Sequence, residues 1–304
     1  MPENIAHCPL CSAEKSSQFD RREFRGQPVS NLICSTCGLV FQSPRMTREE
    51  LNEFYEQQYR ELYQGQEGPG PDDLAVQRRR AESLLAFAEP GISRLANHLD
   101  IGCGAGLLLQ KFREHYGCRS IGIEPGNAYR DYARSAGLKV SPSLDALRAE
   151  LADQQASTRR FDLISLAHVL EHLPEPVVYL QSLRADLLED DGWLLVEVPN
   201  LYCHDSFEIA HLISYSPHTL TQTLKLAGFS PISLIQHGEP RSHILPLYLT
   251  VLARPEEQLS QTVPAPEKGV RSKRQLGLLH RKILVRMFPG RAWIPVHANQ
   301  PSED

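Results

Sequence analysis

The stretch Leu99–Gly106 reads LDIGCGAG, and Ile121–Pro125 reads IGIEP. The first predicts a short buried strand that ends in a turn of three glycines, followed by a helix. Such a turn lets backbone approach a ligand closely, because no Cβ intervenes, and the next helix N-terminus offers free N–H groups. Glu124 closes the second strand, 20 residues after Gly104. A carboxylate at that distance suits the two hydroxyls of a ribose.

The glycine spacing departs from the usual dinucleotide fingerprint. That fingerprint has its third glycine three positions after the second, where this chain has Leu107, and the additional glycine is Gly106. Asp100 also precedes the glycines inside the strand. This D-x-G-x-G-x-G pattern, with Glu124 further on, resembles motif I of the class I methyltransferases that use S-adenosylmethionine. A glycine-rich turn of an oxidoreductase, or of a binding domain without activity, is the alternative interpretation.

Length and composition limit the function classes. The chain has 304 residues and an ordinary globular composition, which allows about two domains. Its net charge of −5 argues against a nucleic-acid partner. No apolar run is long enough to span a membrane, and the N-terminus lacks the apolar core of a secretory signal. We therefore expect a cytoplasmic protein.

Residues 1–45 carry two CxxC pairs, with 22 residues between Cys11 and Cys34. Four thiolates presented in pairs by tight turns are the ligand set of a structural zinc site, although the gap is slightly longer than the usual ~15–20 residues. A unit this small has too little core to fold without a metal. The sequence predicts a small zinc ribbon, and a redox-active dithiol is the alternative. The predicted Zn²⁺ ligands are Cys8, Cys11, Cys34 and Cys37.

Residues 46–79 are expected to connect this unit to the next domain. Thr47–Gln64 has the apolar periodicity of a helix, and its aromatic stripe is expected to dock onto the next domain or to cover the cofactor as a lid. Gly65–Asp73 is rich in glycine and proline, which indicates a linker. The run Arg78–Arg80 is expected to lie on a solvated helix face.

Residues 80–254 have the strand and helix alternation of an α/β domain. Phe161–Ala167 predicts a buried strand, and HVLEHLPEP follows it directly. This segment, with a helix at 177–188 and a strand at 192–200, closely resembles ubiquinone-biosynthesis O-methyltransferases. The resemblance implies a Rossmann-like, doubly wound sheet of seven strands that closes on an antiparallel hairpin near 230–253. A ligand is then expected at the carboxyl ends of the strands.

The resemblance also implies which residues contact S-adenosylmethionine. The glycine turn and the acid before it line the methionine and ribose part, and the acid after the second strand binds the ribose hydroxyls. Side chains after the third and fourth strands lie near the adenine ring and the methionine end. The implied cofactor contacts are Asp100, Gly102, Gly104, Gly106, Glu124, Ser143 and His168.

Candidate catalytic residues follow the predicted fifth strand. A hydroxyl acceptor needs a base near its proton. Phe207–Ser216, FEIAHLISYS, resembles a sugar C-methyltransferase segment that reads approximately YHEHLSYFS, and His211 matches its final histidine. A histidine that only bridges two elements is the alternative for His211, and Glu171 and His172 are expected to brace the next helix. The predicted catalytic candidates are His211, His204 and Tyr215.

Residues 255–304 differ from the preceding domain. From Glu267 to Arg291 the chain has eight lysines and arginines and one acid, with apolar residues at helical spacing. We predict a basic amphipathic helix that packs as a peripheral element or, through 268–291, contacts a membrane surface or a partner protein. Residues 295–304 are expected to be disordered.

The predicted function is S-adenosylmethionine-dependent methyl transfer to a small-molecule acceptor, such as a sugar or another metabolite, at oxygen or carbon. The ribbon before such a domain resembles a methyltransferase subgroup with the same arrangement. The alternatives are a regulatory or non-catalytic module with a methyltransferase fold, and an RNA or protein methyltransferase guided by the ribbon. The intact Gly102, Gly104 and Glu124 favour the enzyme.

Overall fold

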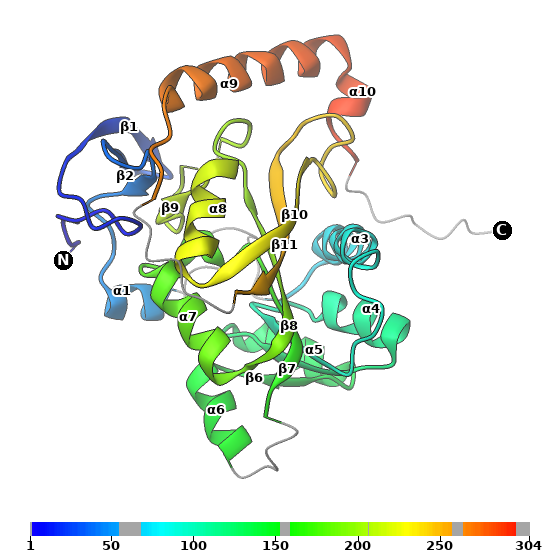
Figure 1. Cartoon of the computed structure of the whole chain (residues 1–304). Helices are drawn as coiled ribbons and strands as arrows, with labels where there is room; N and C mark the ends of the chain where they lie inside the picture. The colour runs from blue at the N-terminus through cyan, green and yellow to red at the C-terminus, as the bar shows by residue number, and fades with distance from the viewer. Residues whose placement is uncertain (1, 55–67, 153–158, 206, 257–263, 296–304) are drawn as a thin grey trace.

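The computed structural model describes residues 2–54, 68–152, 159–205, 207–256 and 264–295. These residues form one sheet of seven strands and one of four (Figure 1). Of the helix predicted at 47–64, the described part is α1, Arg48–Glu53, and most of its aromatic stripe lies outside the described residues, as does 296–304. Within the described ranges, no helix has the length and apolar character needed to cross a membrane.

The seven-stranded sheet has the order β10-β11-β8-β7-β4-β5-β6. Five neighbouring strands run parallel from β6 to β8, and β11 pairs antiparallel with β8 and with β10. The predicted doubly wound sheet with a closing hairpin is therefore confirmed. Because β5 and β7 lie on opposite sides of β4, the carboxyl ends of these strands border one crevice. The strands are β4 (Asn97–Ile101), β5 (Arg119–Ile123), β6 (Lys139–Ser141), β7 (Phe161–Ala167), β8 (Leu188–Pro199), β10 (Phe229–His237) and β11 (Tyr248–Pro255).

Helices cover both faces of this sheet (Figure 1). Trp193 and Leu195 of β8 pack with α3 and α4, whereas Leu194 and Val196 pack on the opposite face with α6, α7 and α8. A strand that is buried on both faces has a nearly continuous run of apolar residues. The segment LLVEV of β8 is such a run, interrupted only by its glutamate. The helices are α3 (Pro71–Ala88), α4 (Leu107–Tyr116), α5 (Asn127–Ser135), α6 (Leu144–Ala152), η3 (Leu170–His172), α7 (Pro176–Asp186) and α8 (Pro217–Leu226).

The N-terminal unit is joined to the large domain through both its sheet and its core. In the four-stranded sheet, β3 pairs with β9, so that Phe41 stands opposite Ile213. Leu39 and Phe41 also belong to the same apolar cluster as the large sheet. The unit that was expected to have too little core of its own therefore shares the core of its neighbour. Its strands are β1 (Ser16–Phe24), β2 (Gln27–Cys34), β3 (Val40–Gln42) and β9 (Ile213–Ser214).

The chain continues beyond β11 into α9 (Val270–Met287) and α10 (Pro289–Ala292), which form an outer layer (Figure 1). Arg274 fixes α9 to the loop after β8. Its buried guanidinium donates to the Leu201 carbonyl, and it also donates to Asp205 Oδ1 at 2.9 Å. The predicted basic helix thus exists, and one of its cations is structural.

Candidate functional site

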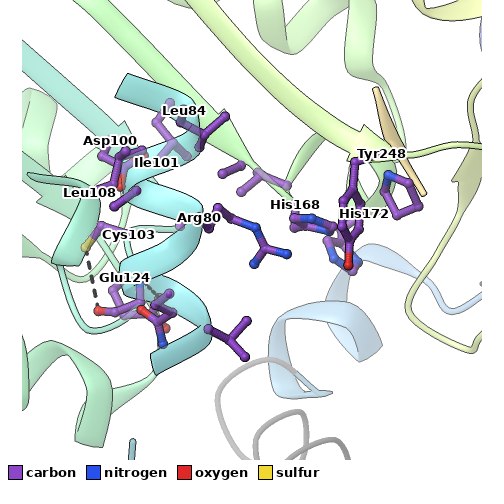
Figure 2. Close-up of a pocket in the computed structure, with 18 of the residues that line it drawn as sticks. Arg80, Leu84, Asp100, Ile101, Cys103, Leu108, Glu124, His168, His172 and Tyr248 are labelled. Carbon is purple, nitrogen blue, oxygen red and sulfur yellow. Dashed lines mark hydrogen bonds between the residues drawn. The ribbon is translucent and has the colours of Figure 1, made fainter. Parts of the chain in front are cut away.

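A cavity of about 730 Å³ opens at the carboxyl ends of β4, β5 and β7. This is the size of a typical small-molecule site. Figure 2 shows Asp100, Cys103 and Glu124 at one end, His168, His172 and Tyr248 at the other, and Arg80 between them. The glycine end is lined by Asp100, Gly102, Gly104, Glu124 and Ser143. The histidine end is lined by His168, His172, His204, His211, Arg241, Tyr248 and Trp293.

Backbone amides hold the Glu124 carboxylate at the glycine end. Gly104 N–H donates to Oε2 at 3.0 Å and Gly126 N–H donates to Oε1 at 2.9 Å. A carboxylate oxygen can accept more than one hydrogen bond. The turn itself requires glycine: Gly102 has φ +72°, and a Cβ there would lie 2.5 Å from Cγ2 of Val169. Gly106, the third glycine, caps α4 and is not part of the cavity lining.

Asp100 is a second buried carboxyl group at this end. Burial raises its pKa to about 7, the hydrogen bond from Ser165 Oγ opposes this rise, and the charge of Glu124 adds to it. The Ser165 hydroxyl lies 2.6 Å from Asp100 Oδ1. Near neutral pH both the protonated and the charged form of Asp100 are therefore populated, and a cation in the cavity would favour the charged form.

Helix α3 supplies a side of the cavity that no sequence motif indicated. Gln77 Oε1 accepts from Ala105 N–H in the glycine turn at 3.1 Å. Arg80 lines the cavity, and its Nε lies 2.8 Å from Oε1 of the fully buried Glu197. The expectation of a solvated arginine run is wrong for Arg80, although Arg78 is exposed. A lone glutamate in the apolar strand at 192–200 was the signal for a buried cationic partner.

His168 stands between two buried carboxylates. Its Nδ1 lies 3.2 Å from Glu171 Oε1 and its Nε2 lies 3.3 Å from Glu197 Oε1. Burial and the charge of Arg80 would lower its pKa, but the two carboxylates raise it above the usual value. With φ +57°, its backbone adopts a conformation that is uncommon outside glycine. His168 thus has a carboxylate near each ring nitrogen, and both carboxylates favour its cationic form.

Two further histidines meet at the far end of the cavity. The rings of His172 and His211 are 4.9 Å apart in a T-shaped contact. His172 Nδ1 donates to the Ala210 carbonyl at 2.8 Å, and burial lowers its pKa to about 4 against the opposing charge of Glu171. His211 Nε2 lies 3.9 Å from Oε2 of Glu208. The ligand atoms of Glu171, His172 and His211 lie within 4.8 Å of one another, so these side chains could share a proton or hold a cation.

The two remaining catalytic candidates differ in position. His204 lines the cavity, and burial lowers its pKa to about 3, with nearby histidine and arginine charges adding to the effect. Tyr215 is completely buried and lies outside the cavity lining, and burial raises its pKa well above the usual value. Of the three candidates, the structure therefore brings His204 and His211 to the cavity.

The four N-terminal cysteines converge at a second place in the molecule. Their sulfur atoms lie within 4.8 Å of one another. The Sγ–Sγ distance is 3.6 Å for Cys8 and Cys37 and 3.5 Å for Cys11 and Cys34. Tetrahedral zinc with Zn–S bonds of about 2.3 Å places its sulfurs about 3.8 Å apart. The donor set and its spacing therefore fit a zinc ion.

Known proteins resemble the large domain. The profile of a family described as "Methyltransferase domain" matches residues 74–234. A ubiquinone biosynthesis O-methyltransferase of Actinobacillus pleuropneumoniae is 33% identical over 107 residues, which is 34% of this chain and 45% of that protein. One from Hahella chejuensis is 37% identical over 81 residues, 26% of this chain and 33% of that protein. The chain thus matches less than half the length of these curated relatives.

A solved structure shows the same fold. The Burkholderia thailandensis 1,6-didemethyltoxoflavin-N1-methyltransferase, which holds 1,6-didemethyltoxoflavin and S-adenosylhomocysteine, aligns with a TM-score of 0.54 and 17% identity. The alignment covers 79% of this chain and all of that one. The family profile spans more than half of the present sequence, from α3 to β10. The chain therefore belongs to the methyltransferase domain family.

Proposed function

We propose that this protein binds S-adenosylmethionine in the cavity and transfers its methyl group to a small-molecule acceptor. The observation that carries the proposal is the Glu124 carboxylate, which is fixed by two backbone amides beside the glycine turn and lines the cavity. A rigid acceptor pair at the end of the second parallel strand suits the two hydroxyls of a ribose. Asp100, at the same end of the cavity, is a second carboxyl group whose charged form a cationic cofactor would favour.

When bound, S-adenosylmethionine supplies an electrophilic methyl group. The protein then has to orient the acceptor, exclude water and remove the acceptor proton. His211 is the proposed proton acceptor, because its ring lines the cavity and its Nε2 lies 3.9 Å from a carboxylate oxygen of Glu208. His172 and His204 remain neutral near pH 7, since burial lowers the pKa of each to about 4 and about 3 respectively.

The proposed acceptor is a metabolite with a hydroxyl group. Tyr248 and Trp293 give the histidine end aromatic surfaces, and Arg241 gives it a cation. A planar ring or a sugar with a hydroxyl near His211 fits this mixture of apolar and polar surface. The names of the curated relatives support methylation at oxygen, and the likeness of Phe207–Ser216 to sugar methyltransferases supports a sugar among the candidates.

The test is calorimetric titration of the protein with S-adenosylmethionine. We expect Glu124→Ala to weaken binding about 100-fold or more, because two hydrogen bonds to a charged group contribute about 1.5–3 kcal/mol each. Glu89→Ala, at an exposed position on the far end of α3, is the matched control and should bind like the wild type. Absence of binding by the wild-type protein, or equal binding by Glu124→Ala, would contradict the proposal.

The four cysteines are proposed to hold one structural Zn²⁺. Because Cys8, Cys34 and Cys37 belong to the same apolar cluster as the large sheet, loss of the ion should loosen more than the N-terminal unit. We expect Cys37→Ser to lose zinc in elemental analysis and to lower the free energy of unfolding by at least about 3 kcal/mol. Cys118→Ser changes a buried cysteine outside the cluster and should keep its zinc. Unchanged metal content in Cys37→Ser would refute the site.

A further inference from the structure

The outer face of α9 carries an apolar stripe that no other described element covers. Leu276, Leu279, Ile283 and Met287 follow one another at spacings of three and four residues, which places them in one row along the helix. Their exposed fractions are 66%, 54%, 45% and 63%. Large apolar side chains this exposed in a continuous row are rarely left in water and mark an interaction surface.

The inner face of α9 is fixed, so the stripe cannot turn inward. Arg281 donates to the Cys203 carbonyl at 2.9 Å, next to the Arg274 contacts described above. Gly277 sits so close to the loop that a Cβ there would lie 2.0 Å from the Tyr202 carbonyl oxygen. Figure 1 shows α9 as the outermost helix on its side of the molecule, running from the neighbourhood of β1 to α10.

Cations flank the stripe on both sides. Lys282 and Arg286 lie along one edge, Lys273 lies along the other, and all three are exposed. From Lys268 to Trp293 the sequence contains eight lysines and arginines and no acidic residue. Phe288 and Trp293, at 44% and 39% exposed, extend the apolar surface beyond the helix. An apolar row with basic edges and an aromatic end is typical of helices that lie in a membrane interface.

We propose that α9 binds the surface of an anionic lipid bilayer, with its apolar stripe among the acyl chains and its basic edges on the lipid phosphates. The charge favours this occupant over a second copy of the chain, because two such helices would repel each other. Arg281 and Trp293 also line the cavity. Binding would therefore bring the histidine end of the cavity close to the lipid surface, independently of which reaction takes place there.

The experiment is flotation of the full-length protein with vesicles. We expect binding to vesicles of equimolar phosphatidylcholine and phosphatidylglycerol, weak binding to phosphatidylcholine alone, and release at about 0.5 M salt. Leu279→Glu with Ile283→Glu should reduce the bound fraction about tenfold or more. Lys282→Glu with Arg286→Glu keeps the stripe and should reduce binding to the anionic vesicles only.

The control is Val178→Glu with Ile232→Glu, which changes two apolar side chains of similar exposure, 59% and 58%, on α7 and β10. Its binding should equal that of the wild type, with circular dichroism confirming that all variants are folded. Three results would overturn the proposal: no flotation of the wild type, equal binding by stripe and control variants, or a doubled mass in light scattering that only the stripe variant loses while vesicles are not bound.

Discussion

The two ends of the cavity are built in different ways. The glycine end comes from the three neighbouring strands β4, β5 and β6 and the turns after them, so its residues lie within the span from Asp100 to Ser143. The histidine end gathers residues from the turn after β7, the loop after β8, β11 and the C-terminal segment. Related proteins that bind the same cofactor need the same local structure around it. The acceptor site is built from several loops, and its shape can differ between proteins wherever one of these loops differs.

The difference separates two kinds of function. Changes at the glycine end should act on cofactor binding, and a change at His211 of the histidine end should act on turnover while the cofactor affinity remains. Arg80 belongs to neither end, since it lies between them and pairs with the buried Glu197. Three predictions test this separation of functions.

The largest effect is expected at the histidine end. With an acceptor found by screening phenols and sugars for S-adenosylhomocysteine release, His211→Gln should lower kcat about 100-fold or more, because a positioned base contributes at least this much. The dissociation constant for S-adenosylmethionine should stay within about twofold. His115→Gln changes a histidine outside the cavity and is the control. A parallel loss of cofactor affinity would mean that the two ends do not act separately.

An intermediate effect is expected for Arg80→Gln. The variant leaves the Glu197 carboxylate buried without its guanidinium, which usually costs about 3–5 kcal/mol. His168 and His237 remain 3.3 Å and 3.2 Å from the carboxylate, so we expect a smaller loss, about 2 kcal/mol of unfolding free energy by denaturant titration. Arg78→Gln on the same helix should lose almost nothing. Equal stabilities of the two variants would argue against the buried pair.

The smallest effect concerns pH and the glycine end. Burial raises the pKa of Asp100 to about 7, so the unliganded protein holds its proton at pH 6 and has mostly lost it at pH 8. The cationic cofactor favours the carboxylate, and binding at pH 6 must therefore release a proton. Affinity should be up to about tenfold weaker at pH 6 than at pH 8, and Asp100→Asn should abolish this difference. Titration in buffers of unlike ionisation enthalpy measures the released proton directly.

The glycine end was predictable because its sequence signals are local. The turn LDIGCGAG, the acid of IGIEP and the strand FDLISLA lie where the sequence placed them, and Gly102 has the positive φ that its role requires. The alternating order of elements indicated an α/β domain, and the resemblance to known methyltransferases implied the doubly wound sheet. The spacing of the two CxxC pairs also predicted that the four cysteines lie close together.

The histidine end was only partly predictable, because its contacts join segments far apart in the chain. His204 and His211 were found from their position after β8, but the roles of Arg80, Tyr248 and Trp293 depend on tertiary packing. Tyr215 was predicted near the site from its position in the sequence, whereas the residue directly follows the short strand β9 and its side chain is buried in the core. The pairing of β3 with β9 likewise links residues about 170 positions apart, a separation at which sequence patterns give no signal.

A structure of the protein with S-adenosylhomocysteine tests the central claim most directly. We predict the nucleoside across the carboxyl ends of β4 and β5, with both ribose hydroxyls within about 3 Å of the Glu124 oxygens and the sulfur directed toward the histidine end. A ligand bound elsewhere, or a ribose turned away from Glu124, would contradict the account.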